Sequence, residues 1–188
     1  MPRAGLDRDV VAATAAAILD GGSELSLARV ASELGVKPPS LYSHVDGLEG
    51  LMRRVAIGAI DGLADACREA VMGVSGRAAL VSLAAAYRRF ASEHPGVYPL
   101  TQVARPDDPE VDAASSRVLE PVMAVLSSWG LEGREAIHAA RTIRSAIHGF
   151  SLLETSGGFG LDVDQDESFD WMIDVLVAGI DALATPDR

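Results

Sequence analysis

The 188-residue sequence has few of the residues on which disulfide-bonded or metal-dependent proteins rely. Its only cysteine, Cys67, cannot form an intrachain disulfide, and its helical surroundings predict a small buried hydrophobic residue. The four histidines include no HxxxH pair, and no Cys/His cluster has the spacing of a zinc site. We therefore expect neither a metal nor a cofactor.

Catalytic motifs are also missing. No GxSxG nucleophile elbow is present, and the glycine-rich run 157–160 follows a predicted helix, which is unlike a phosphate-binding loop. One acidic group lacks the twelve-residue pattern of a calcium loop, and we interpret it as a solvated turn: Asp162, Asp164, Asp166 and Glu167. We expect the protein not to be an enzyme. A small helical enzyme stays an alternative, but the sequence nominates no pair of titratable groups for it.

Long apolar runs, a signal peptide and alternating polar and apolar segments are absent too. No run could span a bilayer, so a cytoplasmic protein without membrane contact is expected. Aromatic residues make up 5% of the chain whereas alanine is abundant, which favours tightly packed helices. Because no segment shows sustained period-two alternation, we predict an all-α fold.

The most informative segment runs from residue 25 to 44, LSLARVASELGVKPPSLYSH. Ser26 is expected to cap a helix whose apolar residues recur at helical spacing, and Gly35 follows where a left-handed stop favours a residue without Cβ. Proline at 38 and 39 suits the first turn of a second helix over 38–44, with Leu41 pointing inward. This pattern predicts a helix-turn-helix whose second helix has the size to enter a DNA major groove. The alternative is a helical hairpin that only packs.

This segment resembles the N-terminal domain of TetR-type transcriptional regulators, from a helix at 9–20 through the motif LARVASELGVKPPSLYSHV to an apolar helix opening at Leu48. The resemblance implies a helix-turn-helix domain over 1–47 that binds a double-stranded DNA operator. It also implies contacts to phosphates and base edges from the following residues: Arg3, Ser26, Lys37, Pro39, Ser40, Tyr42, Ser43 and His44. The family often has a lysine where Leu48 stands, and Arg53 or Arg54 is expected to replace that phosphate contact in part.

The net charge of −11 at pH 7 is unfavourable for DNA binding, but it is unevenly distributed. The first 54 residues contain six Lys/Arg and seven Asp/Glu, so most of the negative charge lies further along the chain. A near-neutral head can bind phosphates if its cations share one side, with modest and salt-sensitive affinity. The acidic balance and Leu48 favour one alternative, a helix-bundle interaction protein with a degenerated DNA-binding head.

The remaining chain reads as helices at about 48–72, 77–93, 97–104, 110–129 and 134–155, and a last helix capped by Ser168. Pro121 is expected to kink or break the helix that contains it. The last two helices are apolar over more than half their circumference, which favours a homodimer built as a four-helix bundle over a large monomeric core. The candidate interface residues are Ile143, Ile147, Phe150, Trp171, Leu176 and Ile180.

The stretch 139–150 resembles a TetR-type C-terminal subgroup known for a Trp-His-Gly signature, of which His148 and Gly149 are present and Ile147 takes the tryptophan position. The resemblance implies a ligand-binding and dimerisation domain over 48–188. Bulky, adaptable side chains are candidates for an effector pocket: Tyr87, Phe90, Tyr98, Met123 and Trp129. We expect a repressor that a small molecule, neutral or cationic and lipophilic, releases from its operator.

Overall fold

The computed structural model describes residues 6–102 and 107–184, and every regular element among them is helical. The chain divides into two compact units. We call residues 1–62 and 93–114 the head, and residues 63–92 and 115–188 the body. The boundary predicted after residue 47 stays a prediction, whereas the compact head includes residues well beyond it.

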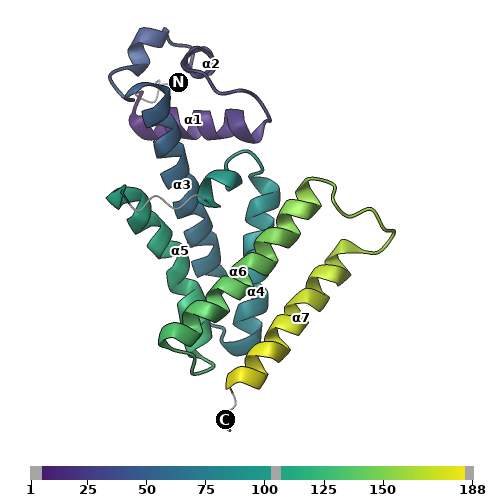
Figure 1. The fold of residues 1–188 in the computed structure, drawn as a ribbon. Helices are drawn as coiled ribbons and strands as arrows, with labels where there is room; N and C mark the ends of the chain where they lie inside the picture. The colour runs from purple at the N-terminus through teal and green to yellow at the C-terminus, as the bar shows by residue number, and fades with distance from the viewer. Residues whose placement is uncertain (1–5, 103–106, 185–188) are drawn as a thin grey trace. The chain divides into compact units, whose positions relative to one another are not determined.

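The head contains α1 (Arg8–Asp20), α2 (Leu27–Glu33), the 3-10 helices η1 (Pro38–Leu41) and η2 (Tyr98–Gln102), and parts of α3 (Gly47–Ala70) and α5 (Pro109–Ser127). Figure 1 shows α1 lying across the first turns of α3. Apolar residues at helical spacing converge in one core, which includes Val11, Ile18, Val30, Leu41 and Leu51.

The helix-turn-helix forms as predicted at its first helix and its turn. The Ser26 hydroxyl accepts a hydrogen bond from the Arg29 amide at 3.2 Å and caps α2. Gly35 adopts the left-handed conformation with φ of +65°, and its amide donates to the Ser32 carbonyl at 3.1 Å. The Val36 amide reaches the Ala31 carbonyl at 2.9 Å, which completes a Schellman stop.

The second helix is shorter than predicted. Residues 38–41 form a 3-10 helix in which the Ser40 amide donates to the Lys37 carbonyl at 2.9 Å, and a turn follows in which the His44 amide donates to the Leu41 carbonyl at 2.8 Å. So short a run closes few i→i−4 hydrogen bonds to offset helix nucleation, and its two prolines supply no amide donor. The tighter 3-10 geometry is the usual result in short segments.

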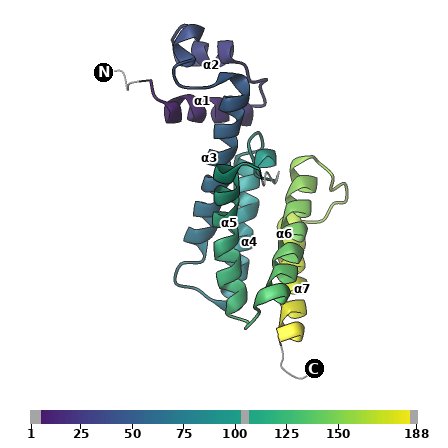
Figure 2. The same ribbon diagram turned by 60° about the vertical axis from the view of Figure 1, so that its left-hand side comes forward.

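The body is built from the end of α3, α4 (Gly76–Glu93), most of α5, α6 (Gly133–Thr155) and α7 (Gln165–Ala184). Figure 2 shows α6 and α7 side by side, as Figure 1 does. α5 continues through Pro121, which therefore does not break it. Cys67 is buried as predicted, and burial raises the pKa of its thiol to about 12. Among helices of the described residues, none combines the length and hydropathy of a membrane span.

The predicted cap of the last helix is wrong. α7 begins at Gln165, and the Asp164 carboxylate accepts hydrogen bonds from the amides of Asp166 at 2.8 Å and Glu167 at 3.0 Å. Ser168 lies inside the first turn, where its hydroxyl donates to the Asp164 carbonyl at 2.9 Å. Part of the predicted acidic turn is thus helical, because aspartate caps a helix as well as serine and favours its positive N-terminus.

Candidate DNA-binding surface

The segment around η1 presents a polar outer edge above an apolar inner one. Leu41 is completely buried in the head core, whereas the neighbouring Tyr42 has 63% of its surface exposed. Lys37, Pro39, Ser40 and Ser43 are also exposed, and His44 is half-buried. The Ser43 hydroxyl donates to the Ser40 carbonyl at 3.0 Å. Hydroxyl, phenol and ammonium groups therefore lie together at the surface, and these groups bind phosphate oxygens and base edges.

The other two predicted contact residues differ in position. Ser26 is exposed at the start of α2, where its oxygen already serves as the helix cap. Arg3 lies outside the described residues.

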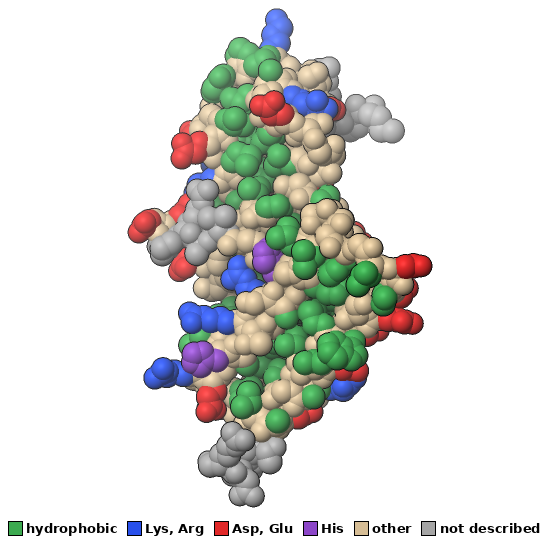
Figure 3. Space-filling view, turned by 45° about the vertical axis from the view of Figure 1, so that its right-hand side comes forward, with side chains coloured by type: hydrophobic (Ala, Val, Ile, Leu, Met, Phe, Trp, Pro, Cys, Tyr) green, Lys and Arg blue, Asp and Glu red, His purple; other side chains and the backbone are tan. Residues whose placement is uncertain are grey.

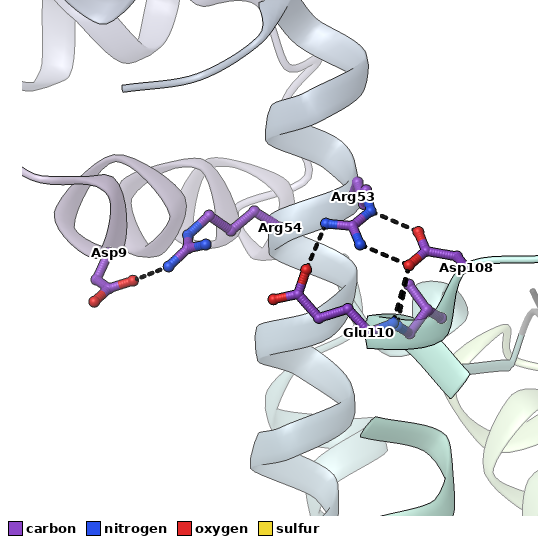
Figure 4. Close-up of polar contacts among 6 residues, drawn as sticks. Asp9, Arg53, Arg54, Asp108 and Glu110 are labelled. Atoms are coloured by element: carbon purple, nitrogen blue, oxygen red, sulfur yellow. Dashed lines mark hydrogen bonds and ion pairs between the residues drawn. The ribbon is translucent and has the colours of Figure 1, made fainter. Parts of the chain in front are cut away.

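The arginines expected to take the place of the missing lysine are engaged within the head (Figure 4). Arg53 donates to both carboxylate oxygens of Asp108, at 2.5 and 2.6 Å, and to Glu110 at 2.8 Å. Arg54 donates to Asp9 at 2.6 Å. Hydrogen bonding from the Arg53 guanidinium lowers the pKa of Asp108 to about 2. Both arginines are therefore engaged by carboxylates of the head in this conformation, and their expected contact to phosphate stays a prediction.

The cations that remain available in the head are few. Arg8, Arg29 and Lys37 are exposed and form no ion pair with any residue that the structure describes. Leu48, at the start of α3, has 42% of its surface exposed, so a longer charged side chain could be accommodated there. Sequence reasoning could not separate these cations from Arg53 and Arg54, because the partner Asp108 lies 55 residues away from Arg53.

The predicted effector-pocket residues fall in both units. Tyr87 and Phe90 are buried on α4, and Met123 is half-buried on α5. The Trp129 indole donates to Asp181 on α7 at 2.7 Å. Tyr98 is buried in η2 of the head. The pocket therefore stays a prediction, and burial of Tyr87, Phe90 and Tyr98 is equally expected of ordinary core residues.

The predicted dimer-interface residues lie mostly inside the chain's own core. Ile143, Ile147, Phe150 and Ile180 are buried within the protomer, and Leu176 is half-buried. Trp171 is 71% exposed. Besides Trp171, α6 and α7 expose large apolar residues that were not predicted: Ile137, Leu152, Leu153, Val175 and Leu183. Figure 3 shows hydrophobic side chains gathered on the face of the body turned to the viewer. Periodicity did not reveal which apolar side of these helices faces inward, because both sides are apolar.

The sequence did not predict one cluster of side chains in the body, which is centred on Arg88. Arg88 of α4 forms a bidentate pair with Glu154 of α6 and an ion pair with Asp166 of α7 at 2.7 Å. Its guanidinium also lies over the rings of Phe150, at 5.3 Å, and Phe169, at 4.7 Å. Hydrogen bonding to Glu154 raises the pKa of Arg88 further. This largely buried cation joins three helices of the body.

Comparison with known proteins relates the chain to transcriptional regulators. Residues 80–176 match the family model of the tetracyclin repressor-like C-terminal domain. The chain is 41% identical to the uncharacterized HTH-type transcriptional regulator Rv0681 of Mycobacterium tuberculosis, covering 97% of this chain and 85% of that protein. It is 33% identical to the uncharacterized HTH-type transcriptional regulator YobS of Bacillus subtilis, covering 95% of each.

Solved structures share the fold. A protein of unknown function from Rhodococcus sp. RHA1 superposes with a TM-score of 0.80 at 24% identity, covering 93% of this chain and 95% of that one. The TetR family protein ActR of Streptomyces coelicolor, in complex with (S)-DNPA, superposes with a TM-score of 0.67 at 21% identity, covering 96% of this chain and all of that one.

Proposed function

The chain belongs to the TetR family of transcriptional regulators, and from this premise we propose that it acts as a dimeric repressor that a small molecule releases from its operator. The observation that carries the proposal is the geometry of η1. Leu41 anchors η1 in the core of the head while Ser40, Tyr42 and Ser43 remain exposed, so the outer edge of η1 is free to lie against a duplex. Lys37 would contact phosphate beside the groove, and the serines would lie near base edges.

The dimer would form through the exposed apolar face of α6 and α7. Leu152 and Leu153 of α6 and Trp171, Val175 and Leu183 of α7 are all at least 48% exposed. A monomer gains nothing from exposing so many large apolar side chains on two neighbouring helices, whereas a second copy would remove them from water. Two heads joined in this way could read half-sites about 34–36 Å apart.

The effector would bind in the body among α4, α5 and α6, where Tyr87, Phe90 and Met123 offer apolar walls. A ligand-bound relative, ActR with (S)-DNPA, supports a small-molecule effector for this fold. The finer assignment to the Trp-His-Gly subgroup rests on His148 and Gly149 of α6. The effector must bind the DNA-competent and the released arrangement with different affinities, since otherwise the population of each would not change.

Operator binding can be tested with labelled DNA from upstream of the gene itself, by fluorescence polarisation at low salt. Lys37→Gln should weaken binding to all duplexes and lower the dependence of affinity on salt. The matched control is Arg134→Gln on exposed α6, which removes the same charge and should leave both unchanged. Absence of specific binding by the wild-type protein would favour the interaction-protein alternative.

Dimerisation can be tested by sedimentation velocity. Trp171→Ala should shift the protein toward monomer without lowering protomer stability, because the indole is 71% exposed. An unchanged monomer–dimer equilibrium for this variant would place the interface elsewhere.

A further inference from the structure

Residues 93–114 belong to the head although 30 residues of the body, 63–92, separate them in sequence from its first part. They begin with the last residue of α4 and end within the first turns of α5. Val97 is 4% exposed and belongs to the same core as Val11 and Ile18 of α1, with Leu100 packed against it. The first part of the segment, residues 93–102, thus contributes to the core of the head.

The beginning of this segment is held by Asp20, the last residue of α1. One carboxylate oxygen accepts hydrogen bonds from the amides of Gly96 at 2.9 Å and Val97 at 3.0 Å. The other oxygen lies 2.9 Å from Nδ1 of His94. A negative charge at a helix C-terminus is electrostatically unfavourable, so local helix stability does not explain this aspartate, whereas its contacts do.

Gly96 brings the segment unusually close to α1. A Cβ on this residue would lie 2.1 Å from both the carbonyl carbon and the carbonyl oxygen of Leu19, and 2.5 Å from the amide nitrogen of Asp20. All three neighbours are backbone atoms and cannot rotate away. Any side chain here would therefore displace the segment from α1.

The end of the segment is held by Arg53 of α3 through the fork to Asp108 and the bond to Glu110 (Figure 4). Asp108 also caps α5, because its Oδ1 accepts from the amides of Glu110 at 3.2 Å and Val111 at 3.3 Å. The segment is therefore fixed to α1 where it begins and to α3 where it ends.

We propose that residues 93–102 and 107–114 hold the DNA-binding surface in its binding arrangement through these two contacts, so that Asp20, Gly96 and Asp108 are positioning residues for DNA binding. The inference rests on the DNA-binding function proposed above.

For substitutions of Asp20 and Asp108, a positioning role and simple electrostatics predict opposite changes in DNA affinity. Removing the charge of Asp20 or Asp108 makes the head less negative, and the second change also leaves Arg53 with Glu110 as its one charged partner among the described residues. Charge alone would therefore tighten DNA binding. If these residues position the surface, the same substitutions weaken binding.

The experiment uses full-length protein and a duplex that the wild-type protein selects from a randomised pool, with affinity measured by fluorescence polarisation at one salt concentration. Asp108→Asn keeps the cap of α5, since asparagine caps as well as aspartate, but loses the charged fork to Arg53. We expect affinity to fall on the order of tenfold. The control Glu49→Gln removes one charge from α3 at an exposed residue that forms no ion pair with a described residue, and this variant should bind as well as wild type or tighter.

Two further pairs of variants distinguish a positioning role from an effect of charge and from a failure to fold. Gly96→Ala changes no charge and should weaken binding, whereas Gly58→Ala on α3, where a Cβ meets nothing within 4 Å, should not. Asp20→Ala should weaken binding, and Asp20→Asn should restore most of it because the amide oxygen still accepts from the two backbone amides. Circular dichroism confirms folding of each variant.

The outcomes are distinguishable. If Asp108→Asn and Asp20→Ala bind as tightly as Glu49→Gln, the inference is overturned while DNA binding itself stands. If the wild-type protein selects no duplex, the proposed function is refuted and this inference with it.

Discussion

Replacing Leu48 by lysine should increase the salt dependence of DNA binding. Leu48 lies at the start of α3 and is 42% exposed, at the position where the resemblance to TetR-type heads implies a lysine. Only Arg8, Arg29 and Lys37 are unpaired cations among the described head residues, so one additional phosphate contact is a large relative gain.

The size of the effect follows from counterion release. Each phosphate neutralised changes the slope of log K against log salt by about 0.9, so one lysine per head steepens the slope of a dimer by about 1.8. Across a fourfold change in salt, from about 50 to 200 mM, the advantage of the Leu48→Lys variant over wild type should fall by roughly twelvefold.

The assay is fluorescence polarisation on one duplex at several salt concentrations. Leu48→Gln controls for loss of the apolar side chain, and Val81→Lys, on a 38% exposed position of α4 in the body, controls for net charge. Equal slopes for Leu48→Lys and Leu48→Gln would refute the placement of Leu48 beside the phosphates. An equal increase for Val81→Lys would show that only total charge matters.

Three other outcomes test the structure. Leu41→Ala should destabilise the head by about 2–5 kcal/mol in urea unfolding because the side chain is fully buried, whereas Tyr42→Ala should change stability by less than about 0.5 kcal/mol and yet weaken DNA binding. Arg88→Ala should lower the free energy of unfolding by roughly 3 kcal/mol, because it leaves the largely buried carboxylate of Glu154 without this partner. Arg77→Ala should lower it by at most about 1 kcal/mol in the same denaturation assay, because the pair of Arg77 with Asp174 is more than half exposed. The folded pKa of Asp108, about 2, lies below its ordinary value of 3.8, so the stability that its pair with Arg53 contributes is present above pH 4 and is lost as pH falls toward 2. In acid titrations followed by circular dichroism, Asp108→Asn should lack this loss of stability between pH 4 and 2. Identical acid transitions for the variant and the wild type would contradict the pairing.

The sequence by itself determined the local features of the head. Ser26, Gly35 and Leu41 each act through their own backbone neighbourhood or one face of a short helix, so residue type and spacing were sufficient to predict a helix-turn-helix with an exposed polar edge. The length of the second helix was not predictable in the same way, because so few hydrogen bonds separate a short α-helix from a 3-10 turn.

Only the tertiary structure decided which residues of similar type act differently. Arg53 and Lys37 are both cations of the head, but one is held by Asp108 from a distant part of the sequence and the other is exposed. Ile147 and Trp171 are both apolar residues of wide apolar helices, but one is core and the other is surface. Such choices depend on which element packs against which side, and no local pattern contains that information.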